Sequence, residues 1–266
     1  MVYTKSISSE SITKNDIVTY QPPSWVEPPA DLNYSIIYED QWFLGINKTG
    51  NLLVHRSGKS VRSNLMYQLR YEHEPCFKNS HSVNRLDREP SGVVLVAKDK
   101  KALRNMHQMW NSGEVKKRYV AVVDGVMKDE KGVIDLPISP MKDGLISYKQ
   151  CVNKESGKDS VTHYSVLKQI GERQFLVELI PVTGRTHQIR VHLEAIGCPI
   201  IGDKLYGMSE YDYLQWRNHN EPTQSVASLF PRQALHCSSL EFYHPFTEKK
   251  CEITAELPKD MAALIM

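Results

Sequence analysis

Residues 163–182, HYSVLKQIGERQFLVELIPV, carry the pattern on which the predicted fold depends. Two runs rich in β-branched and aromatic residues, HYSVLK and QFLVELIPV, stand on either side of Gly171 and Glu172. Such runs, separated by a short segment that contains glycine, are typical of a β-hairpin. The segment therefore predicts two antiparallel strands.

Strand-like runs continue in both directions from this hairpin. SIIYED (35–40) and WFLGINK (42–48) read as a pair, and LEFYHP (240–245) and CEITAEL (251–257) alternate in polarity. The continuous apolar run GVVLVAK (92–98) is typical of a strand buried on both faces. Because the strands come in hairpins rather than in regular alternation with helices, we expect an α+β fold with a mixed, largely antiparallel β-sheet and flanking helices.

Helices are expected at three places between these strands. One begins near Val61, where apolar residues recur at helical spacing. A second has Asp99 at its N-cap position and Gly113 as its stop, and a third has Thr186 as its cap and Gly197 as its stop. These signals predict the flanking helices.

The composition is that of an ordinary globular protein. Of 266 residues, 41% are hydrophobic and 24% are charged, and the first ten, MVYTKSISSE, lack the apolar core of a signal peptide. No apolar run approaches the roughly 20 residues that span a bilayer, so we expect no membrane partner. The five cysteines form no C-x-x-C pair, which argues against a disulfide framework or a zinc ribbon and favours a reducing cytoplasm.

The chain divides into two parts by composition. Residues 1–33 form a polar and then proline-rich arm, and residues 34–266 are expected to be one domain that acts as a monomer, with 208–230 as a surface excursion. The net charge is only +2, but residues 54–71 hold four Lys or Arg and no acid, and residues 98–118 hold seven against two acids. These stretches are either solvated helix faces or a basic surface that attracts a polyanion.

Asp87 is the first candidate for chemistry. It lies in Arg85-Leu86-Asp87-Arg88, just before the buried strand run. Neighbouring guanidinium groups keep a carboxylate ionised, and such a group suits nucleophilic or charge-stabilising work at an electron-poor carbon. The alternative is an ordinary salt bridge in a loop.

Residues 183–190, TGRTHQIR, are the second candidate. Gly184 permits a tight turn, and Arg185 before the expected helix is able to reach a carboxylate or a phosphate. The alternative is a capped surface helix with a polar side. His187 and His192 are five residues apart, which is wrong for a helical zinc pair, so we expect no metal.

Tyr119 is the third candidate, because an aromatic side chain that follows Lys116, Lys117 and Arg118 is suited to stack on a flipped base. The alternative is a tyrosine in the core or at an interface. Ser91 has no histidine partner at a telling spacing, and the glycines match neither G-x-G-x-x-G nor the P-loop pattern. We therefore expect no nucleotide cofactor.

Together these segments resemble the RluA-type family of RNA pseudouridine synthases over roughly residues 34–260. The resemblance rests on R-L-D-R-x-x-S-G (85–92), K-x-Y-x-A (117–121), T-G-R-T-H-Q-I-R-V-H (183–192) and G-x-P-I-x-G-D-x-L-Y-G (197–207), in the family's order. The closing R-Q-A-L-H-C (232–237) and F-x-H-P (242–245) fit as well.

The resemblance implies a pseudouridine synthase-like catalytic domain that isomerises uridine in ribosomal or transfer RNA without cofactor or metal. It implies that Asp87 is the catalytic aspartate, that Tyr119 stacks on the target base and that Arg185 pairs with Asp87. It also implies that Arg85 helps to displace or replace the flipped nucleotide. The glycosidic bond must break in a closed pocket, because water at the intermediate would turn isomerisation into hydrolysis.

Two positions near Asp87 depart from the family pattern: Asn84 stands where histidine is usual and Pro90 where threonine is usual. They leave open an RNA-binding protein on the same fold whose catalysis is lost or secondary. A nucleoside hydrolase that uses Asp87 is a further alternative, although such enzymes usually need a second carboxylate or a metal.

Overall fold

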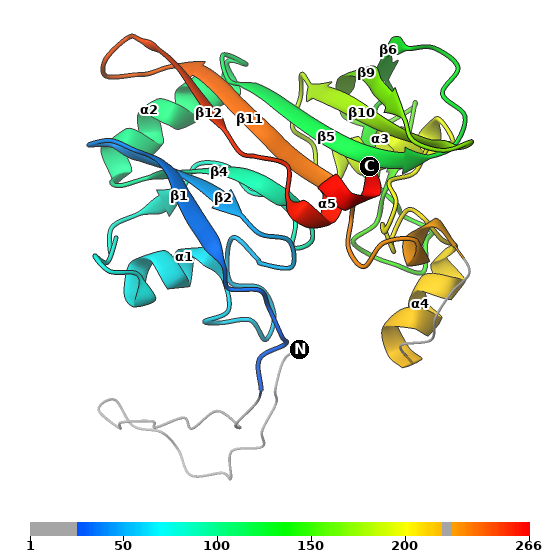
Figure 1. The fold of residues 1–266 in the computed structure, drawn as a ribbon, viewed down its shortest axis with the longest axis horizontal. Coiled ribbons are helices and arrows are strands. Elements are labelled where there is room, and N and C mark those ends of the chain that lie inside the picture. Colours follow the sequence, from blue (N-terminus) through cyan, green and yellow to red (C-terminus); the bar gives the residue numbers. More distant parts are fainter. Residues whose placement is uncertain (1–25, 220–224) are drawn as a thin grey trace.

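The hairpin expected over 163–182 forms as β9 (Val161–Gln169) and β10 (Gln174–Pro181), which pair in antiparallel register. The computed structural model describes residues 26–219 and 225–266. The hairpin belongs to a ten-stranded sheet with the order β1-β2-β4-β11-β5-β10-β9-β6, in which β12 lies beside β11 and β3 beside β4 (Figure 1). Strands β4 and β11 pair in parallel and the other neighbours pair in antiparallel fashion, so the expected α+β fold is confirmed.

The remaining strands have the following bounds: β1 (Tyr34–Glu39), β2 (Phe43–Lys48), β3 (His81–Ser82), β4 (Ser91–Ala97), β5 (Lys116–Asp124), β6 (Lys131–Asp135), β11 (Leu235–Tyr243) and β12 (Lys250–Thr254). A separate two-stranded sheet consists of β7 (Ile138–Pro140) and β8 (Gln150–Val152). The helices are α1 (Leu65–Tyr67), a π-helical turn (Gln68–Glu72), α2 (Lys100–Asn111), α3 (Gln188–Ala195), α4 (Glu210–His219), a 3₁₀ turn (Val226–Ser228) and α5 (Lys259–Leu264).

The capping signals predicted one helix well. Asp99 caps α2 through a hydrogen bond of 2.8 Å from the amide of Ala102, and Gly113 follows the helix with φ of 81°. The helix expected near Val61 is limited to α1 and the π-helical turn after it. The 208–230 excursion contains α4 and the 3₁₀ turn.

The start of α3 corrects a prediction. Thr186 is not its cap, because the helix begins only at Gln188, after His187 in the left-handed conformation. The side chain of Gln188 holds the preceding loop: its Oε1 accepts from the amide of Arg185 at 2.9 Å and from the hydroxyl of Thr183 at 2.7 Å. The loop therefore extends one residue further than the sequence predicts.

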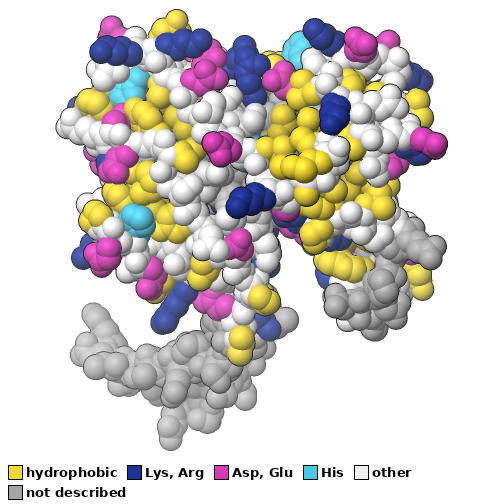
Figure 2. Space-filling model, viewed as in Figure 1, with side chains coloured by type: hydrophobic (Ala, Val, Ile, Leu, Met, Phe, Trp, Pro, Cys, Tyr) yellow, Lys and Arg dark blue, Asp and Glu magenta, His cyan; other side chains and the backbone are white. Residues whose placement is uncertain are grey.

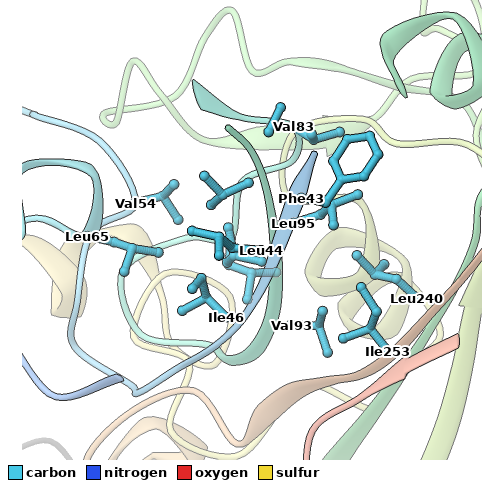
Figure 3. Close-up of a cluster of buried hydrophobic side chains, with 14 of the residues drawn as sticks. Phe43, Leu44, Ile46, Val54, Leu65, Val83, Val93, Leu95, Leu240 and Ile253 are labelled. Carbon is cyan, nitrogen blue, oxygen red and sulfur yellow. The ribbon is translucent and has the colours of Figure 1, made fainter. Parts of the chain in front are cut away.

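Two apolar clusters fill the two halves of the sheet. Figure 3 shows the first, where Phe43, Leu44 and Leu95 from β2 and β4 pack with Leu240 of β11. The second lies around β5 and β10 and includes residues of α3 and α5. Tyr119 on β5 contacts both clusters, so this residue lies where the two halves of the core meet.

Gly92, the second residue of β4, is required by the parallel contact between β4 and β11. Its φ is 111°, and a Cβ there would lie 2.2 Å from the carbonyl oxygen of Cys237. No side chain fits between backbones this close, so the glycine allows the strand after Asp87 to pack against β11.

The arm expected over 1–33 is described only from residue 26 onward, where it has no helix or strand up to residue 33. Glu27 accepts hydrogen bonds from the amides of Arg62 and Ser63, which ties this segment to the domain. On the face in Figure 2, Lys and Arg side chains lie among Asp and Glu, and apolar side chains gather over the half with β5 and β10. None of the helices in the described ranges has the length and hydropathy that crossing a bilayer requires.

Candidate active site

A cavity of about 430 Å³ brings together residues from distant parts of the chain. Its walls come from the loop before β4, the start of β5, the end of β10 and the first turn of α3. All four residues singled out in the sequence, Arg85, Asp87, Tyr119 and Arg185, line it. Residues 54–71 contribute His55 to the wall, and residues 98–118 contribute Trp110 and Lys117.

Asp87 lies in the loop before β4 with its side chain 31% exposed. Its Oδ2 accepts a hydrogen bond of 2.8 Å from Nη1 of Arg190, and Nε2 of His187 lies 3.7 Å away. Burial alone would raise the pKa of Asp87, but the charge of Arg190 and further contributions outweigh it and hold the pKa below its usual range. The carboxylate is therefore ionised at neutral pH and accessible from the cavity.

Arg190 is held in turn by a second carboxylate. Its Nε and Nη2 donate to the two oxygens of Asp203 at 2.6 and 2.9 Å, and its guanidinium lies 4.8 Å from the ring centroid of Tyr206. Asp203 is fully buried and also accepts from the amides of Leu205 and Tyr206. This bidentate pair fixes the guanidinium and leaves Nη1 directed at Asp87.

The expected pair between Arg185 and Asp87 is wrong. Arg185 is exposed, and its Nε donates to the carbonyl oxygen of Asp159 at 3.1 Å. The physical reason is where the two side chains lie: Arg185 is in the exposed loop before α3 and is bound to Asp159, whereas Arg190 lies within the helix, is buried and reaches the carboxylate. Arg185 remains a lining residue of the cavity and a candidate contact for substrate.

His187 stands between Asp87 and Tyr206 at the start of α3. Its φ of 57° is in the left-handed region, and its Nδ1 lies 2.9 Å from the hydroxyl of Tyr206. Burial lowers the pKa of His187 to about 4, and the charge of Arg190 acts in the same direction. The imidazole is therefore neutral at pH 7 and adds no second charge beside the carboxylate.

Tyr119 and Arg85 differ in how firmly they are held. Tyr119 lies on β5 between the two apolar clusters, and burial raises its pKa well above the usual value, so the phenol stays protonated. Arg85 is exposed and lines the cavity two residues before Asp87. Tyr119 is therefore held in place by packing, whereas Arg85 is an exposed side chain that lines the cavity.

Comparison with known proteins assigns the family. Residues 43–195 match the model of the RNA pseudouridylate synthase family. The chain is 37% identical over 226 residues to ribosomal large subunit pseudouridine synthase C of Buchnera aphidicola, which covers 85% of this chain and 67% of that protein. A protein of the same name from Vibrio cholerae is 35% identical over 237 residues, which covers 89% and 70%.

The chain belongs to the RNA pseudouridine synthase family. It is therefore an isomerase that acts on RNA, as the RluA-type resemblance implies. A solved structure, human RNA pseudouridylate synthase domain containing 1, superposes with a TM-score of 0.67 at 27% identity and covers 87% of this chain and 86% of its own.

Lys48 is a residue of the synthase that the sequence analysis missed. Its fully buried ammonium donates to the carbonyl oxygens of Thr49, Leu52, Arg88 and Pro90 at distances from 2.6 to 3.2 Å. Two of these carbonyls belong to the loop that follows Asp87. The signal was a lysine at the end of the apolar run WFLGINK, where a buried strand would not otherwise place a charge.

The structure also shows what the two departures from the family pattern do in this synthase. Asn84 is buried: its Oδ1 accepts from the amide of Leu95 at 2.8 Å and its Nδ2 donates to the carbonyl of Val93 at 3.3 Å. Pro90 contributes its carbonyl oxygen to the ammonium of Lys48 at 2.6 Å. Both residues hold the loop around Asp87 to the strands beside it.

Ser91, for which the sequence shows no histidine at a telling spacing, has a distant histidine as its neighbour in the structure. The hydroxyl of Ser91 lies 2.9 Å from Nδ1 of His236. Both residues are buried, and Nε2 of His236 lies 3.1 Å from the carbonyl oxygen of Ala255. The pair lies outside the lining of the cavity and links β4 to β11.

Proposed function

We propose that this synthase isomerises uridine in ribosomal RNA, with Asp87 as the catalytic carboxylate. The observation that carries the proposal is the ionised Asp87, held by Arg190 at 2.8 Å, in a cavity that it shares with Tyr119. The names of the relatives favour ribosomal over transfer RNA. An enzyme that modifies ribosomal RNA works where ribosomes are assembled, so we propose a cytoplasmic location.

The reaction breaks the bond from N1 of uracil to C1′ of ribose and forms a bond from C5 to C1′. A proton leaves C5 and one is taken up at N1, so no atom is gained or lost. An ionised carboxylate assists by bonding to the sugar or the ring, or by stabilising positive charge at C1′. Asp87 is suited to each of these roles because it is deprotonated and fixed in position.

The target base must leave the RNA stack before Asp87 is able to reach it, at a cost of a few kcal/mol. In the proposal, Tyr119 stacks on the flipped uracil, Arg85 occupies the space that the base leaves, and Arg185 contacts the strand. The basic stretch 98–118 contributes Lys117 to the lining of the cavity, which also includes Arg85 and Arg185, and these cations support a polyanion as ligand. All of these residues belong to one chain, so we propose that a monomer holds the complete site.

The test is to map pseudouridine in ribosomal RNA from cells with and without the gene, and to repeat the mapping with Asp87→Asn. This variant keeps the size of the side chain and removes its charge. We expect at least one ribosomal uridine to lose modification in both the deletion and the variant, while purified Asp87→Asn still binds that RNA. Modification lost only from transfer RNA would contradict the proposed substrate.

Mass spectrometry of the reacted RNA separates the alternatives. Isomerisation leaves the mass unchanged, a nucleoside hydrolase releases uracil, and an RNA-binding protein without catalysis changes nothing. Substantial pseudouridine formation by a folded Asp87→Asn protein would refute the role of the carboxylate.

A further inference from the structure

Lys117 lies on the cavity side of β5, two residues before Tyr119. Because side chains alternate along a strand, Lys117 and Tyr119 point to the same face of the sheet. Both line the cavity. The side chain of Lys117 is therefore part of the same cavity wall as Tyr119, the expected stacking platform.

The surroundings of this ammonium leave its charge uncompensated. Lys117 is 9% exposed, its Nζ donates to the carbonyl oxygen of Thr183 at 3.3 Å, and it lies 5.7 Å from the ring centroid of Trp110. An ammonium group has three donors, and this single hydrogen bond is long. Among the residues that the structure describes, no carboxylate forms an ion pair with it.

The other buried cations of the site differ from Lys117 in this respect. Arg190 has two carboxylates and Lys48 has four carbonyl oxygens. Burial lowers the pKa of Lys117, which reflects the cost of holding its charge away from water. Such a cost is recovered when a ligand brings an anion to the site.

The space beside the ammonium is open to a ligand. A Cβ placed on Gly184 would meet one atom within 4 Å, the Nζ of Lys117 at 4.0 Å. Gly184 is exposed, and Arg185 next to it lines the same cavity. A group that enters over Gly184 would therefore meet Lys117 directly.

We propose that Lys117 binds a phosphate of the RNA backbone directly beside the target uridine. The inference rests on the proposed function, since it takes RNA as the ligand of this cavity. A nucleotide whose base stacks on Tyr119 has one phosphate on its 5′ side and one on its 3′ side. Either supplies the full negative charge that the ammonium lacks, and Lys117 would thereby fix the nucleotide relative to Asp87.

The test combines one protein change with one RNA change. The probe is a short RNA on which the wild type forms pseudouridine, with the charged linkage on the 5′ or the 3′ side of the target replaced by a neutral methylphosphonate. Those two sugars are 2′-deoxy in every oligonucleotide, so that the neutral linkage is stable. Dissociation constants are measured for wild type, Lys117→Met and, as a matched loss of one exposed lysine, Lys131→Met on β6.

We expect wild type to lose about tenfold in affinity when one of the two linkages is neutral, because a charge-assisted hydrogen bond is lost. Lys117→Met should bind the charged RNA about tenfold more weakly and discriminate less than twofold between charged and neutral RNA at that linkage. Lys131→Met should behave as wild type. The linkage that responds identifies which phosphate is bound.

Two results would overturn the inference. One is that the losses in binding free energy caused by Lys117→Met and by the neutral linkage add up at both the 5′ and the 3′ position. Additive losses would mean that the ammonium does not contact either phosphate. The other is a melting temperature that falls in Lys117→Met while discrimination persists, which would make Lys117 a packing residue. If wild type forms no pseudouridine in any RNA, the proposed function itself fails, and this outcome is distinct from both.

Discussion

Replacement of Arg190 by lysine tests the arrangement around Asp87 most directly. The guanidinium makes three charge-assisted hydrogen bonds at once, two to Asp203 and one to Asp87, at 2.6 to 2.9 Å. An ammonium keeps the charge but not the planar fork that serves both carboxylates. We expect Arg190→Lys to fold, to be less stable and to be nearly inactive.

The size of the stability loss follows from the contacts. Lysine is able to retain one or two of the three contacts, so one or two charge-assisted hydrogen bonds of about 1.5–3 kcal/mol each are lost. Asp203 keeps the amides of Leu205 and Tyr206, at 3.0 and 3.2 Å, so its buried carboxylate is not left without partners. We therefore expect the free energy of unfolding to fall by about 2–4 kcal/mol, which corresponds to roughly 5–10 °C in melting temperature.

Arg190→Lys keeps the positive charge, so its effect on the isomerisation rate comes from a shift in the position of the Asp87 carboxylate. A reacting group displaced by about 1 Å costs on the order of a hundredfold. The assay is single-turnover isomerisation at saturating RNA, well below the melting temperature of the variant. The control is Arg173→Lys, whose pair with Asp124 at 3.3 Å is exposed and should contribute less than about 0.5 kcal/mol. A rate for Arg190→Lys within threefold of wild type would refute the positioning role.

Four further outcomes are expected. Because Arg190 and other neighbours outweigh burial and hold the pKa of Asp87 below its usual value, the single-turnover rate should stay constant from pH 8 to about 5; an inflection near pH 6 would contradict this. The stability that this pair contributes should be present above about pH 4 and be lost as the pH falls through the lowered pKa, as acid titration of unfolding would show. Lys48→Met should lower the free energy of unfolding by about 2–4 kcal/mol in urea, because four buried carbonyls lose their donor; unchanged stability would contradict its clamping role. His187→Val should be less stable than His187→Asn by about 1–3 kcal/mol, because φ is 57° and asparagine tolerates that region; equal melting curves would argue against strain there.

The parts of the fold that the sequence predicted well are those set by near neighbours. The turn at Gly171 and Glu172 and the cap at Asp99 involve partners within a few residues, and each formed in the structure. The parallel contact between β4 and β11 was not predicted, because it joins segments far apart in the chain. Gly92 permits this contact. The sequence shows the glycine, but it does not show that the backbone of Cys237 packs against it.

The same limit explains the error at the site. The segment TGRTHQIR (183–190) contains both Arg185 and Arg190, and the family resemblance assigned the carboxylate to Arg185. Arg185 precedes the helix in the prediction and in the structure, and there it is held by Gln188, whose side chain binds the amide of Arg185 and Thr162 on β9. The pair that results joins residues 103 positions apart. Local patterns found both arginines but were unable to rank them.

The departures at Asn84 and Pro90 bear on the alternative of an RNA-binding protein without catalysis. Loss of catalysis would require these residues to disturb Asp87 or its partner. Instead, the amide of Asn84 is engaged with the backbone of β4, and Pro90 offers Lys48 a carbonyl oxygen, which any residue at that position would provide. Neither side chain stands between Asp87 and Arg190, whose contact is 2.8 Å. The two substitutions therefore change how the loop is held and leave the charged pair intact, so they give no reason to separate this chain from the catalytic members of its family.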